Sequence, residues 1–291
     1  MKKKSGVIST IIFTLIFIIG LAIMLYPIVS DWWNSKVQSR AVASYDQTVA
    51  EMDETEYELI LQKARDYNAK VAKLNAPLAE ADSLPEYYEI LDVSGTGIMG
   101  YITIPLIKVE IPIYHGTSES VLNIAAGHLQ GTAFPIGGEN THAVISAHRG
   151  LPTSKLFSDL DKLVVGDTFT VTILNEVYTY EVEDIFIVEP HEVEKLAVIP
   201  NGDYVTLMTC TPYGVNSHRL LLRSKRIETV YQSTVRVVSD AVQVDPLLVV
   251  PLLSTPLLIG LIIFWIFSGR KKKSLPYRNP LYTLPPRKYD E

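Results

Sequence analysis

Two side chains of types suited to nucleophilic catalysis lie at the ends of neighbouring apolar runs. Cys210 closes the run 204–210, and Pro212 follows it. Proline cannot donate to a strand ladder, so we expect a strand to end near the cysteine. Eight residues separate Cys210 from Arg219, which opens the next apolar run. If the two runs pair as a hairpin, the guanidinium lies beside the thiol, where it favours the thiolate and can donate hydrogen bonds to an oxyanion.

His148 is the best candidate for a partner base among the six histidines. It follows the apolar run 143–147, and Gly150 and Pro152 signal a turn directly after it. A histidine at such a strand end can activate a thiol or protonate a leaving amine. His142 begins the same run, so we expect it at the opposite end of the strand.

The other histidines fit structural positions better. We expect His128 to have a structural role in a turn, His115 and His191 to lie in loops, and His218 to face away from Arg219 on its strand. Each catalytic candidate also has an ordinary alternative. A lone cysteine in an apolar strand is commonly an inert core residue, a strand-end arginine a solvated charge, and a histidine near a turn a polar surface group. Position alone leaves both interpretations open.

Composition narrows the class of protein. The length of 291 residues suits one medium domain with additional segments. Hydrophobic residues make up 47% and charged residues 20%, which excludes a disordered polyelectrolyte. A net charge of −6 argues against nucleic acid as the partner. The single cysteine excludes an internal disulfide and a zinc site built from cysteines alone.

Both ends of the chain carry the pattern of a membrane span. Residues 5–30 lack charge and follow three lysines, while 246–269 lack charge and precede the basic cluster 270–273. About 20 apolar residues suffice to cross a bilayer as a helix. The positive-inside rule then predicts two spans at the cell membrane, cytoplasmic termini and an extracellular middle. A cleaved signal peptide and a buried core helix are the respective alternatives.

The segment between the spans changes character near residue 97. Residues 32–72 have helical periodicity, and 78–97 are irregular and turn-rich. Beyond them, β-branched and aromatic runs separated by turn signals predict a mainly β domain, a barrel or a sandwich. Expected strands are 98–104, 110–114, 143–147, 168–174, 178–189, 204–209 and 219–226, and expected short helices are 118–126 and 154–162.

These boundaries divide the chain into six parts. They are the basic end and first span at 1–30, a helical segment at 31–96, the β domain at 97–232, a linker at 233–245, the second span at 246–269 and a basic cytoplasmic tail at 270–291.

Three motifs around the candidate residues closely resemble those of the sortases, membrane-bound cysteine transpeptidases of Gram-positive bacteria. Thr206-Leu-Met-Thr-Cys210 is similar to the family's TLxTC, and His218-Arg219-Leu and Ser146-Ala-His148-Arg-Gly150 resemble the segments carrying the family's arginine and histidine. The resemblance spans 97–227. The class C, pilus-assembling branch is matched most closely by Gly100-Tyr-Ile-Thr-Ile-Pro105, Ile113-Tyr-His-Gly-Thr117, Gly127-His-Leu-Gln-Gly-Thr132 and Gly137-Gly-Glu-Asn-Thr141.

The resemblance implies an eight-stranded sortase-type β-barrel and a defined reaction. Cys210 would cleave an LPxTG-like sorting signal at its Thr–Gly bond and form a thioester. His148 would act as general acid and then base, and Arg219 would bind substrate and stabilise the oxyanion, with Thr209 as a supporting residue. A pilin lysine would then take the acyl group, giving a covalent pilus. The resemblance implies no metal and no organic cofactor.

The sequence departs from the class C pattern in one respect. Members of that branch commonly carry a lid with an Asp-Pro-aromatic triplet over the cysteine, and the corresponding region here is 78–97. It offers only Asp82, Ser83 and Leu84 as candidate lid residues. We therefore expect a more open active site than is usual for the branch.

Three other functions remain alternatives. The first is a sortase that attaches surface proteins to peptidoglycan amines. The second, from another class, is a non-catalytic surface β-domain for adhesion or assembly. The third is a cysteine L,D-transpeptidase, whose Ser-x-Gly-Cys type segment differs from the Met208-Thr209 pair before Cys210.

Overall fold

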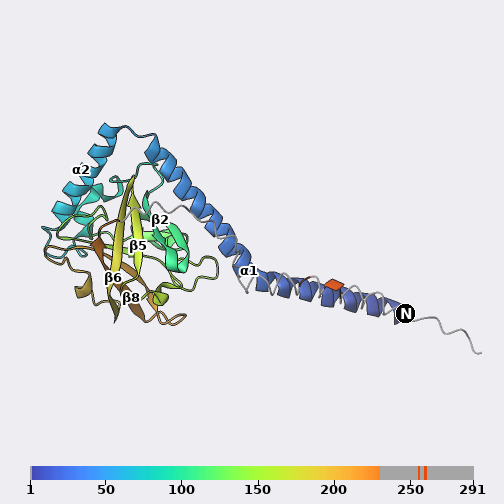
Figure 1. Cartoon of the computed structure of the whole chain (residues 1–291). Helices are drawn as coiled ribbons and strands as arrows, with labels where there is room; N and C mark the ends of the chain where they lie inside the picture. Colours follow the sequence, from blue (N-terminus) through green and yellow to red (C-terminus); the bar gives the residue numbers. More distant parts are fainter. Residues whose placement is uncertain (1, 230–254, 256–258, 261–291) are drawn as a thin grey trace, which may run out of the picture. The chain divides into compact units, whose positions relative to one another are not determined.

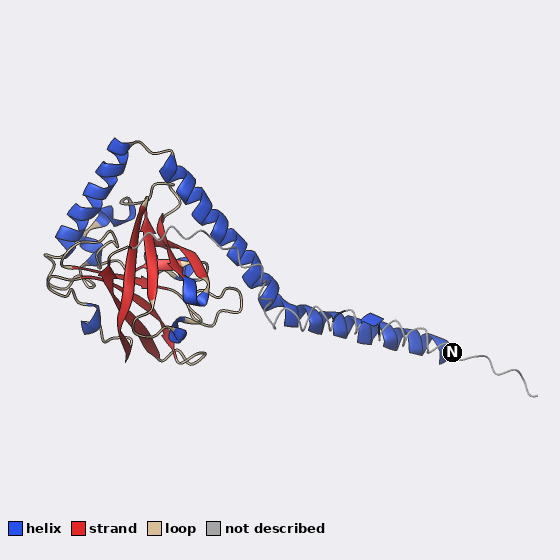
Figure 2. Cartoon of the chain, in the orientation of Figure 1, coloured by secondary structure: helices blue, strands red, loops and turns tan. Residues whose placement is uncertain are grey.

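The structure is a computed structural model that describes residues 2–229, 255, 259 and 260. Its described residues fall into two compact units, divided between Ile23 and Met24. The second unit holds the β-strands, with helices along its side (Figures 1 and 2). Helix α1 (Lys2–Ala50) begins in the first unit and ends in the second.

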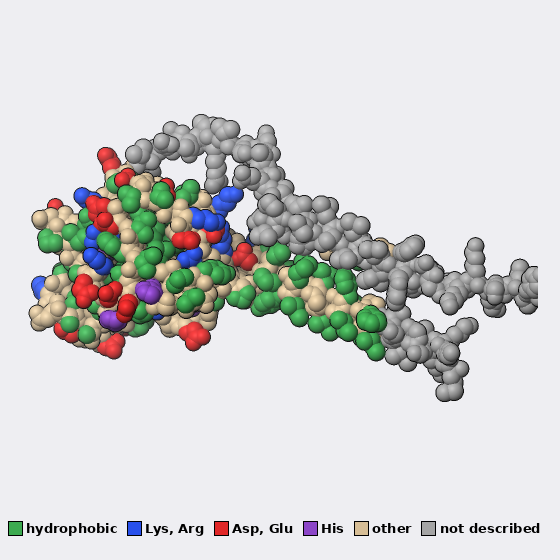
Figure 3. All heavy atoms as spheres, turned by 90° about the horizontal axis from the view of Figure 1, so that it is seen from below, with side chains coloured by type: hydrophobic (Ala, Val, Ile, Leu, Met, Phe, Trp, Pro, Cys, Tyr) green, Lys and Arg blue, Asp and Glu red, His purple; other side chains and the backbone are tan. Residues whose placement is uncertain are grey.

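The first part of α1 is strongly apolar. Within the described residues, the helix running through Ile12–Ala50 is the one long and apolar enough to cross a membrane. Its visible side is mostly hydrophobic, whereas the barrel surface mixes charged, polar and apolar groups (Figure 3). The second predicted span, 246–269, lies outside the described residues except for Thr255, Ile259 and Gly260, which are helical.

The second unit contains a closed barrel of eight strands within the described residues, in the order β1-β2-β3-β4-β7-β8-β6-β5. The pairs β2–β3 and β4–β7 are parallel, and the others are antiparallel. The mainly β, eight-stranded barrel expected from the sequence is confirmed. The strands are β1 (Ile98–Ile104), β2 (Val109–His115), β3 (Ala126–His128), β4 (Thr141–Ser146), β5 (Thr168–Ile173), β6 (Glu176–Val188), β7 (Asp203–Thr211) and β8 (His218–Ile227).

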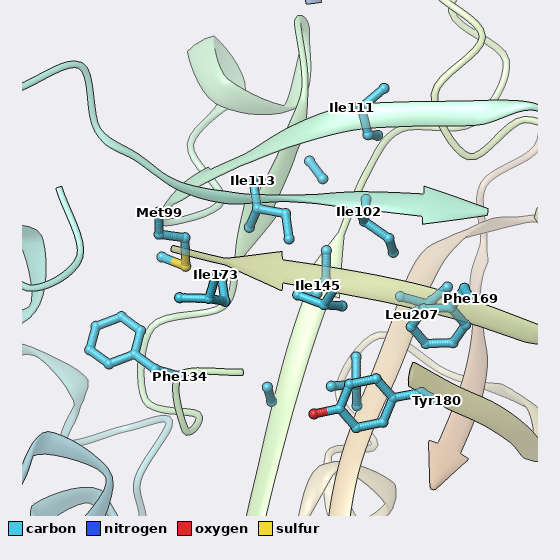
Figure 4. Close-up of a cluster of buried hydrophobic side chains, with 14 of the residues drawn as sticks. Met99, Ile102, Ile111, Ile113, Phe134, Ile145, Phe169, Ile173, Tyr180 and Leu207 are labelled. Carbon is cyan, nitrogen blue, oxygen red and sulfur yellow. The ribbon is translucent and has the colours of Figure 1, made fainter. Parts of the chain in front are cut away.

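Alternate side chains of each strand fill the barrel. On β7, Val205 and Leu207 are fully buried in the core, and Leu222 faces Leu207 from β8. Each such side chain contributes about 1.5–3 kcal/mol when buried. Figure 4 shows side chains from several strands meeting in this core, among them Met99, Ile102, Ile113, Ile145, Phe169, Tyr180 and Leu207. The filled interior leaves the outer face of the sheet for a functional site.

The expected helical segment 32–72 is two helices rather than one. Helix α1 ends at Ala50, and α2 (Glu54–Val71) begins after Asp53, whose carboxylate accepts a hydrogen bond from Glu56 N at 2.8 Å. This cap satisfies a backbone donor that a new helix otherwise leaves unpaired. Both helices lie against the barrel unit: Tyr45 of α1 bonds to Met99 O, and Asn68 of α2 bonds to Phe134 in both directions.

Among residues 2–229, the other helices are the short α3 and five single-turn 3-10 helices. The expected helices at 118–126 and 154–162 are shorter than predicted. Within those ranges the structure has α3 and η4. The elements are α3 (Glu119–Leu122), η1 (Ala81–Ser83), η2 (Pro85–Tyr88), η3 (Pro105–Ile107), η4 (Leu160–Lys162) and η5 (Glu194–Leu196).

Strand β3 is an element that the sequence pattern did not reveal. Residues Ala126–His128 pair with β2 on one side and β4 on the other. Three residues are too few to display an alternating pattern. A Cβ added at Gly127 would lie 2.2 Å from Gly116 O, so this close approach requires glycine.

Two histidines expected elsewhere lie in buried strand positions. His115 was predicted to be in a loop, and that prediction was wrong: it ends β2, with ring nitrogens 3.0 Å from Gly97 O and 2.7 Å from Ile90 O. His128 ends β3, with Nε2 2.8 Å from Ala133 O and Nδ1 2.9 Å from the Tyr87 hydroxyl. A carbonyl oxygen only accepts, so Nε2 of His128 carries a proton, and burial, which lowers the pKa of the ring to about 3, keeps it neutral near pH 7.

Burial of His128 makes the barrel sensitive to acid. Removal from solvent lowers the pKa of His128 from 6.5 to about 3, and the bond to Ala133 O opposes this only in part. In the unfolded chain His128 binds a proton near pH 6.5, whereas in the folded chain it stays neutral until the pH approaches 3. This contribution to stability is therefore complete above pH 6.5 and is lost as the pH falls toward 3.

We expect the unfolding temperature of the full chain in detergent to fall more steeply between pH 7 and pH 4 than that of His128→Gln. His191 is largely exposed, so His191→Gln is the matched control and should keep the wild-type slope. Scanning calorimetry across this range measures all three. Equal slopes for the wild type and His128→Gln would contradict the assignment.

Candidate active site

Cys210 and Arg219 lie side by side at one end of the barrel. They occupy β7 and β8 and are directly paired across the antiparallel ladder, so their side chains share a face. Both residues are half-buried. The hairpin pairing expected from their spacing is present.

His148 reaches the same end from the other side of β7. Strand β4 runs parallel to β7, and its last ladder pair joins Ser146 to Met208. Extending that register by two residues brings His148 level with Cys210 and onto the same face, because side chains alternate along extended chain. The fold thus brings the three predicted residues into one row, which we call the catalytic row (His148, Cys210 and Arg219).

Thr209 holds the ends of β4 and β7 together. It is almost fully buried, and its hydroxyl donates to Ala147 O at 2.8 Å. The Ala147 N–H in turn donates to Met208 O at 3.2 Å. The two bonds continue the β4–β7 pairing up to the residue before His148. A supporting role for Thr209 in the reaction stays a prediction.

The Arg219 guanidinium is bound by the loop that joins β7 to β8. Its Nη1 donates to Asn216 O at 3.2 Å and to His218 O at 3.1 Å. Arginine has five N–H donors, and these two bonds use one nitrogen. These bonds hold the guanidinium at the loop backbone, while the ladder places the Arg219 backbone directly across from Cys210. His218 is paired with Thr211, one residue beyond the Cys210 pair, so its side chain projects from the opposite face, as expected.

The outer face below the catalytic row combines apolar and charged groups. Met208 pairs with Leu221 one row down, and Arg223 lies two rows below Arg219. Arg223 forms an ion pair with Asp184 and lies 5.0 Å from the centre of the Phe186 ring. An extended peptide placed along this face would meet the half-buried Met208 next to the row and a paired cation farther on, whereas Leu221 is buried.

The loop between β6 and β7 covers the far end of this face. Ala197 O lies 2.8 Å from Nδ1 of His142, whose Nε2 lies 2.7 Å from the Thr206 hydroxyl. Burial lowers the pKa of His142. The loop also lines a mostly apolar hollow of about 330 Å³, together with segment 75–79, turn 131–133 and His142. His142 is six residues from His148, or about 20 Å along a strand.

The candidate lid residues lie in a segment anchored away from the catalytic row. Asp82 and Ser83 are exposed in η1, and Leu84 packs against the core cluster. Ala81 O accepts a hydrogen bond from the Gln130 amide at 3.1 Å. Leu129, next to Gln130, bonds to Val144 O, so this anchor lies toward the His142 end of β4. A lid formed by these residues stays a prediction.

Arg149 is a site residue that the sequence analysis did not single out. It directly follows His148, and its side chain is 9% exposed. Its place inside the motif 146–150 could have indicated a role, but only the histidine of that motif was considered as a site residue. Within the described part of the chain, no group of three or more His, Cys, Asp or Glu side chains is arranged to hold a metal ion.

The chain is similar to a family model and to several known proteins over the region that carries these residues. A family model described as "Sortase domain" matches residues 102–227. The chain is 34% identical over 117 residues to a sortase A of Streptococcus agalactiae, covering 39% of this chain and 47% of that protein. It is 27% identical over 218 residues to sortase SrtE2 of Streptomyces coelicolor, covering 72% and 78% respectively. The chain thus spans about half the length of the curated sortase A that it matches.

Solved structures match over more of their own length. Sortase C1 of Streptococcus agalactiae is similar with a TM-score of 0.61 and 47% identity, covering 65% of this chain and 99% of that one. Sortase C of Streptococcus pneumoniae has a TM-score of 0.60 and 45% identity, covering 65% of this chain and 97% of that one.

The position of η1 generates a prediction about access to Cys210. Because Asp82 is exposed and its segment is anchored toward the other end of β4, we expect Asp82→Ala to leave the rate of Cys210 alkylation by iodoacetamide unchanged. Mass spectrometry over time measures the rate, with Glu80→Ala as the control for a lost charge in the same segment. A several-fold acceleration in Asp82→Ala alone would show that Asp82 helps to cover the thiol. Deleting 78–92 is a poor test because it removes the buried Tyr87 and Ile90.

Proposed function

The chain belongs to the sortase family, whose members are cysteine transpeptidases, and we propose that it cleaves an LPxTG-like sorting signal and transfers the acyl part to a pilin lysine. The observation that carries this proposal is the catalytic row. It combines a nucleophile, a proton-transfer group and a cation at one end of three adjacent strands.

In the first half-reaction, the Cys210 thiolate attacks the carbonyl carbon of the signal's threonine. The negative charge that develops on the carbonyl oxygen lies next to the Arg219 guanidinium, which stabilises it by hydrogen bonding. His148 protonates the glycine nitrogen as the C–N bond breaks. The glycine-side fragment leaves as an amine, and the acyl group remains on Cys210 as a thioester.

In the second half-reaction, an amine replaces the enzyme on the acyl group. His148, now neutral, removes a proton from the attacking amine, and Arg219 again stabilises the oxyanion. The C–S bond breaks, an amide forms and the Cys210 thiolate is regenerated. Water in place of the amine would give simple hydrolysis of the thioester.

The proposed site of action is the outer surface of the cell membrane. The apolar helix α1 supports an anchor at the N-terminal end. The second span, at 246–269, and cytoplasmic positions for both termini are part of this proposal and rest on the charge pattern of the sequence. An anchored enzyme meets anchored substrates by diffusion in two dimensions, which suits sorting signals of membrane-held pilins.

The preference for a pilin lysine over a peptidoglycan amine rests on the class C likeness. The similar solved chains are C-type sortases, and the Streptococcus pneumoniae structure is described in terms of pilin substrate specificity. A lysine side chain of a folded pilin and the amine of a peptidoglycan stem differ in size and charge, so the acceptor can be identified by competition between the two.

We expect the full chain in detergent to gain the mass of the acyl fragment when incubated with an LPxTG peptide in the absence of an amine. Intact-protein mass spectrometry measures the adduct, and Cys210→Ala should give none. Adding a lysine peptide should release the adduct as an isopeptide-linked product.

The choice of acceptor and the control variants separate the alternatives. Faster release by a peptidoglycan stem amine than by a lysine peptide would favour wall attachment. Arg219→Ala should still fold, because Arg219 bonds only to neighbouring loop carbonyls among the contacts described, but it should acylate at least about a hundredfold more slowly. No adduct across a panel of sorting signals would favour the non-catalytic domain.

A further inference from the structure

Arg149 holds three segments together just behind the catalytic row. Its Nη2 lies 2.5 Å from Oδ2 of Asp161 in η4, and its Nη1 donates to the Thr211 hydroxyl at 3.4 Å. Its guanidinium also lies 5.8 Å from the centre of the Tyr213 ring in the β7–β8 loop. The Arg149 side chain is only 9% exposed, whereas the side chain of its partner Asp161 is 46% exposed.

The contacts of Arg149 complete a symmetrical arrangement around the catalytic pair. His148 lies between Ala147 and Arg149, and Cys210 lies between Thr209 and Thr211. The Thr209 hydroxyl bonds to Ala147 O, and the Thr211 hydroxyl accepts from Arg149. Each residue beside the cysteine is therefore bonded to the corresponding residue beside the histidine.

The chain after Arg149 is packed closely enough to resist movement. Gly150 has a φ of +80°, and a Cβ there would lie 3.1 Å from the Tyr213 ring. The Gly150 N–H donates to the Ser158 hydroxyl at 3.0 Å, and Phe157 N donates to His148 O at 3.1 Å. The segment carrying His148 is thus held from the far side, while Arg149 fixes it to the end of β7.

We propose that Arg149 is a positioning residue that sets the separation between the His148 imidazole and the Cys210 thiol through the paired bonds on either side of them. In the reaction the thiol and imidazole must stay within hydrogen-bond reach while the acyl group is transferred. Removing the Thr211–Arg149 bond leaves Thr209 as the remaining hydroxyl link between the two segments. The effect on acyl transfer rests on the proposed function, whereas the effect on thiol reactivity does not.

Positioning predicts a change in the chemical step with little change in peptide binding. Consecutive residues of an extended chain project to opposite sides, so the Arg149 side chain lies on the opposite side from the face that carries His148. A loss of Arg149 should therefore spare the surface that contacts peptide. A small displacement of reacting groups can reduce a rate by up to about a hundredfold.

The first test uses Arg149→Gln in the full chain, with Arg65→Gln, an exposed site on α2, as the matched control. Acylation by an LPxTG peptide is followed over a range of peptide concentrations. We expect Arg149→Gln to lower kcat at least about tenfold and to change KM less than about twofold. A wild-type kcat, or a loss confined to KM, would overturn the proposal.

A second variant keeps the test valid if Arg149→Gln does not fold. Thr211→Val removes only the accepting hydroxyl and keeps the side-chain volume, so we expect a smaller loss of kcat. Arg149→Lys retains the charge but lacks the planar guanidinium that bonds to Asp161 and Thr211 together. Its kcat should therefore lie between those of the wild type and Arg149→Gln. If both residues act through one bond, the double variant Arg149→Lys with Thr211→Val should lose a smaller factor in kcat than the product of the factors lost by the two single variants. Independent, fully multiplicative losses would overturn the proposal.

Alkylation of Cys210 by iodoacetamide separates this proposal from the proposed function. The reaction needs a reactive thiol but no sorting signal. Arg149→Gln should be alkylated several-fold more slowly than Arg65→Gln. Slow alkylation in Arg149→Gln, combined with no peptide adduct in the wild type, would sink the proposed function and leave the positioning role standing. Normal peptide adducts in the wild type, with Arg149→Gln and Arg65→Gln alkylated at equal rates, would support the proposed function and overturn the positioning role.

Discussion

The candidate site depends on β7 having a parallel neighbour on one side and an antiparallel neighbour on the other. Because β4 is parallel to β7, the two strands end at the same edge of the barrel. Because β8 is antiparallel, it begins where β7 ends. A histidine after β4, a cysteine at the end of β7 and an arginine at the start of β8 are therefore neighbours. Reversing the direction of β4 would carry the histidine to the opposite edge of the barrel.

The barrel core maintains this register. Shifting β7 by one residue would turn Val205 and Leu207 outward and Cys210 inward, at a cost of several buried side chains. Parallel strands need long connections, and here the crossover from β4 to β7 contains β5, β6 and the loop that contacts His142. Apolar packing thus fixes the face, and the crossover fixes the direction of the strand that supplies the cysteine.

Polar contacts fix the relative positions of the strand ends that apolar packing has brought together. Thr209 and Thr211 are both buried, and their hydroxyls bond across to the chain on either side of His148. Buried hydroxyls and guanidinium groups are costly to leave unpaired, so each partner tends to hold the other in one place. The same logic applies beside β4, where His128 pairs with Ile145 and, with Tyr87, attaches the N-terminal segment to the barrel.

The sequence alone was enough to identify the three candidate residues, the strands that end beside them and the mainly β class, because these depend on local patterns of residue type and spacing. The Cys210–Arg219 pairing followed from the length of a hairpin loop, which is a local constraint as well. The tertiary structure decided the parallel pairing of β4 with β7, the short strand β3, the break between α1 and α2, and the burial of His115 and His128. It also revealed Arg149, whose partners Asp161 and Thr211 are distant in sequence. These features arise from contacts between segments far apart in the chain, and neither residue periodicity nor turn signals carry information about such contacts.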